Sequence, residues 1–159
     1  LKRNFSITSL SLRSNCYLSS CVLRRLLNIC PNIEKLILNK CFTREEQLDM
    51  ADILGCSSRI RSLELSECWH LKFSKTDAGV SKLRELVAAY SGLGDETLGI
   101  IGKTCPALVH LDLRDCNKLT EEGVKEVVRS CGRLRFLSLR ACSNVNSDIT
   151  ASVVPARHP

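Results

Sequence analysis

One spacing of hydrophobic residues recurs along most of the chain. In its clearest copy, leucines at 108, 111 and 113 precede a cysteine at 116, and the positions between them are mostly polar. Copies of this spacing start near residues 7, 33, 60, 83, 108 and 134. Their second hydrophobic residue falls at positions 10, 36, 63, 86, 111 and 137, in steps of 26, 27, 23, 25 and 26 residues. A register held this closely predicts an internally repeated fold.

Each copy predicts a short strand followed by a helix. The alternation around the second and third hydrophobic positions has the period of a strand. Downstream of that strand, Thr120 can cap a helix, and Val124, Val127 and Cys131 fall on one helical face. Because a unit of this size cannot bury its hydrophobic face alone, neighbouring units must stack. We therefore predict an α/β solenoid with a parallel sheet on its concave face and helices outside.

The repeats predict a single domain over residues 1–150, and residues 151–159 are expected to form a disordered tail. The fourth copy departs most from the pattern, because Ala88 replaces its third leucine and Ser91 stands at the cysteine position. Residues 69–82 fit neither periodicity. We therefore expect six repeats, of which the fourth is degenerate, and the least regular structure around residues 69–82.

Eight of the ten cysteines fall into two columns of the repeat. One column ends the strand segment and the other lies near the end of the helix; the members are Cys41, Cys68, Cys116 and Cys142, and Cys30, Cys56, Cys105 and Cys131. No two cysteines are three residues apart, which argues against a zinc site. Stacked strands would allow cross-strand disulfides, and these stay an alternative. The favoured interpretation is buried free thiols in a reducing compartment.

Two local motifs strengthen the repeat assignment. The stretch from Cys116 to Val124 reads C-x-x-L-T-E-E-G-V, and Cys105 opens C-P-x-L. With them, residues 5–150 closely resemble the cysteine-containing leucine-rich repeat family, as in F-box/LRR proteins and their ribonuclease-inhibitor-like relatives. The resemblance implies a right-handed leucine-rich repeat solenoid, a segment of a horseshoe.

The same resemblance implies a function. Such repeats commonly form the substrate-recognition half of an SCF-type ubiquitin ligase subunit, whose F-box docks onto Skp1 in the Skp1–cullin complex. Because the repeats already begin at Ile7, we expect a fragment that lacks the F-box. The alternative is a leucine-rich repeat scaffold or inhibitor unconnected to ubiquitination.

Residues that flank the strand leucines are expected to face the concave side and to bind a protein partner. The candidates on this face are His110, Asp112, Arg114, Phe136, Arg140, Glu85 and Lys35. Trp69 and Tyr90 follow their strands and are expected at the rim, where each could instead pack over the third and fourth repeats. For the concave residues the alternative is pairing across the sheet, such as Asp112 with Arg140 or Arg114.

Charge and composition narrow the remaining functions. The net charge is +6, but the excess is scattered within residues 1–40 and lacks the basic and aromatic clustering of a nucleic-acid site. No stretch approaches the roughly 18 apolar residues of a membrane helix. His110 has Asp112 on its strand face but no adjacent nucleophile. We expect no enzyme, no cofactor or metal, no nucleic-acid or membrane partner, and a cytoplasmic or nuclear location.

Overall fold

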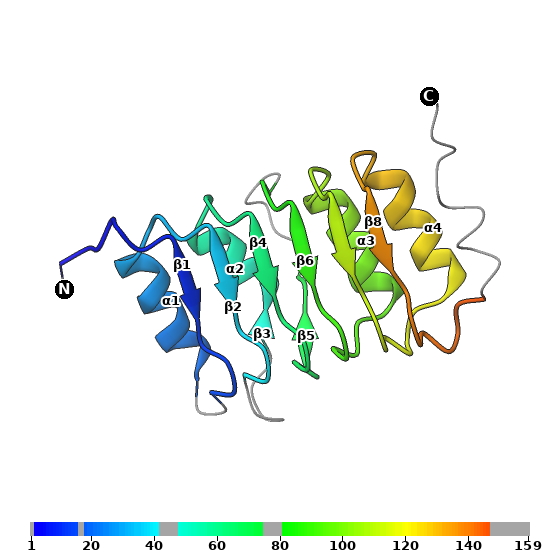
Figure 1. The fold of residues 1–159 in the computed structure, drawn as a ribbon, viewed down its shortest axis with the longest axis horizontal. Coiled ribbons are helices and arrows are strands. Elements are labelled where there is room, and N and C mark those ends of the chain that lie inside the picture. The colour runs from blue at the N-terminus through cyan, green and yellow to red at the C-terminus, as the bar shows by residue number, and fades with distance from the viewer. Residues whose placement is uncertain (1, 16–17, 42–47, 75–80, 147–159) are drawn as a thin grey trace.

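The chain folds around a six-stranded parallel sheet. The computed structural model describes residues 2–15, 18–41, 48–74 and 81–146. The strands lie side by side along the long axis in the order β1 (Ser9–Ser11), β2 (Lys35–Ile37), β4 (Ser62–Glu64), β6 (Glu85–Val87), β7 (His110–Asp112) and β8 (Phe136–Ser138) (Figure 1). The sheet is parallel throughout, as predicted.

Helices follow the first, second, fourth and fifth of these strands. They are α1 (Ser20–Ile29), α2 (Met50–Cys56), α3 (Asp95–Thr104) and α4 (Glu121–Ser130), and they lie on one side of the sheet (Figure 1). A second, two-stranded parallel sheet joins β3 (Leu48–Asp49) to β5 (Leu71–Lys72), and β5 lies within residues 69–82, the region predicted to be least regular. No helix among the described residues is long and apolar enough to span a membrane.

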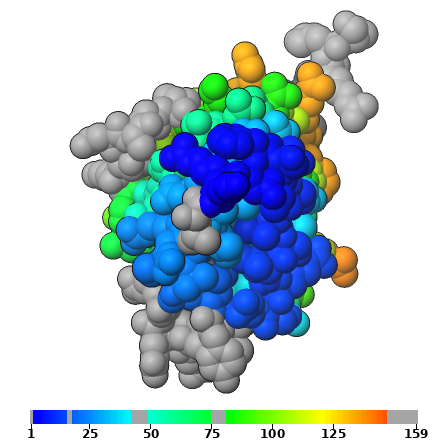
Figure 2. All heavy atoms as spheres, turned by 90° about the vertical axis from the view of Figure 1, so that its left-hand side faces the viewer, coloured from blue at the N-terminus to red at the C-terminus, as the bar shows by residue number. Residues whose placement is uncertain are grey.

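The marker leucines of the repeat lie in register across the sheet. Leu10, Leu36, Leu63, Leu86, Leu111 and Leu137 are successive pairing partners. Leu86, from the degenerate fourth copy, therefore occupies the same place as the others. In the middle of the sheet these leucines are fully buried between strands and helices, whereas Leu10 and Leu137 on the two edge strands are only partly buried. Figure 2 views the N-terminal end, which β1 and α1 form.

Each strand is followed by a turn that contains one residue with positive φ. The six residues are Ser14, Lys40, Glu67, Tyr90, Asp115 and Ala141, with φ values between 55° and 61°. None of them is a glycine, so each carries a modest conformational cost. Their recurrence directly before the cysteine column identifies the turn as a constant part of the repeat.

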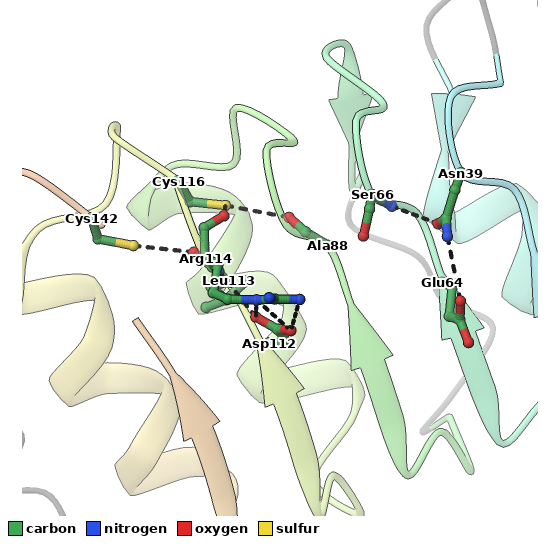
Figure 3. Close-up of polar contacts among 9 residues, drawn as sticks. All are labelled: Asn39, Glu64, Ser66, Ala88, Asp112, Leu113, Arg114, Cys116 and Cys142. Carbon is green, nitrogen blue, oxygen red and sulfur yellow. Dashed lines mark hydrogen bonds and ion pairs between the residues drawn. The ribbon is translucent and has the colours of Figure 1, made fainter. Parts of the chain in front are cut away.

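The first cysteine column ties each turn to the preceding repeat. The Cys68 thiol donates to the Leu38 carbonyl at 3.1 Å, and the Cys142 thiol donates to the Leu113 carbonyl at 3.1 Å. The Cys116 thiol reaches the Ala88 carbonyl at 3.3 Å (Figure 3), and Cys41 makes the same contact with Leu12. These thiols therefore act as buried hydrogen-bond donors as well as small apolar groups.

In the fourth repeat a serine takes the cysteine position, and its hydroxyl bonds within its own repeat. Ser91 is fully buried at the cysteine position, and its hydroxyl donates to the carbonyl of Ala88 within its own repeat. The Ser91 hydroxyl also lies 3.6 Å from the Cys116 sulfur. A hydroxyl at a cysteine position is thus satisfied, which explains why the sequence deviates here without breaking the fold.

The second cysteine column closes the helices. Cys30, Cys105 and Cys131 are the C-cap residues of α1, α3 and α4, and Cys56 is the last residue of α2. The backbone N–H of each C-cap cysteine donates to a carbonyl of the last helical turn, at Leu26, Ile101 and Val127. Both columns thus lie where the repeat predicted. All nine cysteines among the described residues are free thiols.

Burial predicts how these thiols react. It raises the pKa of Cys68 and Cys105 to about 12, so few thiolates form at neutral pH. Titration of the native chain with a thiol reagent at pH 8 should modify exposed Cys21 quickly, half-buried Cys56 more slowly and the seven buried column cysteines most slowly. In denaturant all ten should react. Rapid native labelling of the column cysteines would contradict their burial, and four or more disulfides would contradict the free-thiol interpretation.

Helices α3 and α4 approach each other closely because small residues line their contact. A Cβ added at Gly102 would lie 2.9 Å from the Ser130 Cβ, and one added at Gly123 would lie 2.2 Å from an Asp95 carboxylate oxygen. Asp95 also binds the start of α4. Its Oδ1 accepts from the Thr120 N–H at 2.8 Å, and its Oδ2 accepts from the Thr120 hydroxyl at 2.6 Å. The Asp95 carboxylate therefore links the N-termini of the two helices.

Candidate protein-binding surface

The side chains that flank the strand leucines occupy the sheet face opposite the helices, here called the open face. Some of the predicted site residues on this face bind a side chain on a neighbouring strand and others do not, and their solvent exposure differs. Arg114, Phe136 and Arg140 are exposed, Lys35, Glu85 and His110 are half-buried, and Asp112 is buried. The two halves of this face have different chemistry.

In the N-terminal half, the cationic side chains lie in ion pairs across the sheet. Glu64 is the centre of this network: Lys35 Nζ lies 3.0 Å from its Oε1, and Arg13 Nη2 lies 3.6 Å from its Oε2. The Asn39 side chain donates to the same carboxylate at 3.3 Å (Figure 3). The hydrogen bond to Glu64 raises the pKa of Lys35. Lys35 is therefore engaged across the sheet, which is the alternative that the sequence left open for these residues.

Glu85 lies next in the sheet and is engaged more weakly. Its Oε2 accepts a hydrogen bond of 2.6 Å from the Ser62 hydroxyl on the neighbouring strand. A hydroxyl supplies no compensating charge, so Glu85 keeps its negative charge on the open face. The sequence alone did not identify Ser62 as the partner of Glu85, because that pairing depends on the register of the two strands.

In the C-terminal half, Asp112 holds Arg114. The Arg114 Nε lies 3.0 and 2.9 Å from the two Asp112 oxygens, and its Nη2 lies 2.9 Å from Oδ2 (Figure 3). Only 9% of the Asp112 side chain is exposed, against 46% of the Arg114 side chain. The hydrogen bond to Asp112 raises the pKa of Arg114. Of the two partners that the sequence allowed for Asp112, Arg114 is the one it binds.

An aromatic pair lies beside this ion pair. His110 on β7 and Phe136 on β8 are direct partners across the sheet. Their rings stack with centroids 4.2 Å apart and planes inclined by 14°. Phe136 remains 47% exposed, so it presents an apolar surface on the open face. Arg140 follows on the same segment, is exposed, and forms no ion pair with any described residue.

The two predicted rim residues are both exposed. Trp69 is 63% exposed and Tyr90 is 45% exposed. A hydrogen bond with Asp115 raises the pKa of the Tyr90 hydroxyl. Trp69 lines a pocket of about 560 Å³ beyond the ends of the strands, with His70, Gly92, Asp115, Asn117 and Lys118. The sequence identified Trp69 but missed this pocket, whose walls come from three successive repeats.

The described residues hold no group of three or more histidine, cysteine or acidic side chains arranged to bind a metal ion. The open face carries paired charges, one exposed aromatic stack and exposed guanidinium groups. Exposed aromatic and arginine side chains are the residue types that contribute most to protein interfaces.

Comparison with known proteins gives three informative relatives. F-box/LRR-repeat protein 4 of Bos taurus is 24% identical over 89% of this chain and 23% of its own length. Putative F-box/LRR-repeat protein 23 of Arabidopsis thaliana is 28% identical over 72% of this chain and 27% of its own. F-box/LRR-repeat protein 5 of Bos taurus is 32% identical, over 49% of this chain and 11% of its own. The chain thus spans about a quarter or less of the length of these relatives.

A structural relative shares the fold. The crystal structure of InlP from Listeria monocytogenes superposes with a TM-score of 0.52, covering 86% of this chain and 44% of that one. The identity is 16%, so the likeness concerns the fold alone. No known family model matches the chain. The curated relatives nevertheless confirm what the leucine and cysteine spacing predicted: the chain resembles the F-box/LRR-repeat proteins.

Proposed function

We propose that this chain is a right-handed leucine-rich repeat solenoid of six repeats that binds a protein partner on its open, concave face. The observation that carries the proposal is the C-terminal half of that face, next to the Asp112–Arg114 pair. There Phe136, stacked on His110, is exposed, and Arg140 is exposed without an ion pair to any described residue. The six strands in register and the F-box/LRR relatives support the same role.

In its cellular setting, the chain is the substrate-recognition part of an F-box/LRR subunit of an SCF-type ubiquitin ligase. The names of the curated relatives support this assignment. The free thiols of the two columns support a reducing location, cytoplasmic or nuclear. The F-box would lie elsewhere in the full-length protein and would connect the bound partner to Skp1 and the cullin.

Site-specific cross-linking tests the binding face. A photoreactive phenylalanine analogue placed at position 136 should cross-link a discrete protein in cell extract, and adding R140E should remove that product. The control position is Val22 on α1, which is also exposed but lies on the helical side, and it should give no such product. Equal products from positions 136 and 22 would contradict binding on the open face.

Co-precipitation tests the ligase assignment separately. The full-length protein should recover Skp1, and deletion of the region outside the repeats should abolish that recovery. If Skp1 is absent while the cross-link at position 136 persists, the chain is a leucine-rich repeat scaffold or inhibitor. The binding role would then stand without the ubiquitin ligase.

A further inference from the structure

The orientation of Arg114 is fixed by a buried carboxylate. Asp112 occupies one edge of the guanidinium, formed by Nε and Nη2, and it also accepts from the Arg114 backbone N–H at 3.2 Å. The remaining edge, which includes Nη1, forms no hydrogen bond with any described residue. A guanidinium held on one edge can bind a second carboxylate on the other, because its donors are arranged in a rigid fork.

A second guanidinium adds positive charge at the same place. Arg140 occupies the position on the β8 segment that Arg114 occupies on the β7 segment, and its carbonyl accepts from the Asp115 N–H at 2.9 Å. Arg140 is exposed and forms no ion pair with any described residue, so its guanidinium stands beside that of Arg114 as a second donor group. The nearby Asp115 carboxylate hydrogen-bonds the Tyr90 hydroxyl and keeps its negative charge, so the two arginines offer directed donors and not a net positive patch. The N-terminal half differs, because both of its cations, Lys35 and Arg13, lie in ion pairs with Glu64.

The apolar stack lies at a defined spacing from this charge. His110 precedes Asp112 by two residues on β7, so their side chains point to the same side of the sheet about 7 Å apart. The Arg114 guanidinium lies on Asp112, and the exposed Phe136 ring lies on His110. An extended peptide has the same two-residue period. An apolar residue and an acidic residue two positions apart would therefore match the stack and the guanidinium.

We infer that the open face across β7 and β8 binds an extended acidic segment of the partner, with an apolar side chain on the His110–Phe136 stack and a carboxylate on the free edge of Arg114. This inference rests on the proposed function and specifies the chemistry of its partner. Arg140 contributes a second charge to the same carboxylate. The partner segment carries the pattern of an apolar residue, any residue, then aspartate or glutamate.

Titration with a short peptide tests this arrangement directly. The probe is acetyl-Leu-Ala-Glu-amide, followed by NMR of ¹⁵N-labelled chain through the arginine Nε–H signals. At millimolar peptide the Arg114 signal should shift and saturate, and replacing glutamate by glutamine in the peptide should weaken binding about tenfold or more. R114K should weaken it as strongly, because lysine keeps the charge and loses the fork.

The matched control is R129K on α4, an exposed arginine on the helical side, which should bind the peptide like the unaltered chain. Circular dichroism of each variant checks that the fold is kept. The inference is wrong if the unaltered chain does not bind the peptide, if the glutamine peptide binds equally well, or if R114K binds normally.

The two proposals fail in different ways. If R114K abolishes peptide binding but the cross-link at position 136 is absent, the carboxylate site exists and the open face is not the partner surface. If the cross-link persists in R114K and the peptide shifts no arginine signal of the unaltered chain, the partner binds this face through other chemistry. Only the second result removes the inference while leaving the proposed function.

Discussion

Replacing Gly123 by alanine is expected to destabilise the chain by about 2–3 kcal/mol, through overpacking and a strained helix cap. The added methyl group would lie 2.2 Å from the Asp95 Oδ1 and 2.9 Å from the Asp95 Cβ. Rotation of the carboxylate could relieve the first contact, but the second involves an atom fixed to the backbone of α3. The two helices must therefore separate, and Asp95 must lose part of its bonding to Thr120.

Urea unfolding followed by circular dichroism measures this loss as a lower midpoint. Gly55→Ala is the control, because Gly55 lies in α2 with nothing within 4 Å of an added Cβ. Its better helix propensity should leave the chain equally stable or more stable by up to about 1 kcal/mol. The double variant D95A/G123A should cost less than the sum of its single variants, since the clash is shared. Equal stability of G123A and G55A would show that the helices do not depend on this close approach.

Replacing Leu111 by alanine is expected to cost about 3–5 kcal/mol, at the upper end for a buried leucine. Leu111 is fully buried on β7 and lies between Leu86 and Leu137 in the sheet. Strands and helices on all sides prevent the cavity from collapsing. The same substitution at Leu137 removes the same side chain from the edge strand, where burial is partial, and should cost only about 1–2 kcal/mol.

Thermal and urea unfolding of both variants, compared with the unaltered chain, test this gradient. The comparison is controlled internally, because the two leucines occupy the same position of successive repeats. Similar losses at both positions would mean that the edge strand is covered as thoroughly as the middle of the sheet. A smaller loss at Leu111 than at Leu137 would contradict the packing described for β7.

The periodicity of the sequence sufficed to predict the sheet and the places of both cysteine columns, because equivalent residues of stacked repeats are buried in the same way. The positions of Leu10 to Leu137 in register follow from the steps between them. Helix starts were less predictable. Thr120 is the N-cap of α4, as predicted, but the repeat pattern did not identify Asp49, the N-cap of α2, which begins at Met50.

The pairing of charges on the open face could not be predicted in the same way. The sequence placed Asp112 beside two arginines, and only side-chain geometry decides that Arg114 rather than Arg140 binds it. The ion pairs of Glu64 join residues from three strand segments that are far apart in the sequence, so no local sequence pattern predicts them. The pocket at Trp69 likewise depends on how turns from three repeats meet. Repetition predicts backbone and core, whereas recognition depends on the residues that differ between repeats.

The shortest thiol hydrogen bonds of the first cysteine column all run from one repeat to the repeat on its N-terminal side. Each thiol satisfies a carbonyl in the repeat before it, as Cys142 does for Leu113, so a turn is completed only when its successor is in place. Opening a repeat that carries such a cysteine thus withdraws a donor from its N-terminal neighbour, whereas Ser91 in the fourth repeat bonds within its own repeat and interrupts the series. Thermal openings should therefore propagate by steps from the ends, and backbone amides of β4, β6 and β7 should exchange with solvent deuterium last.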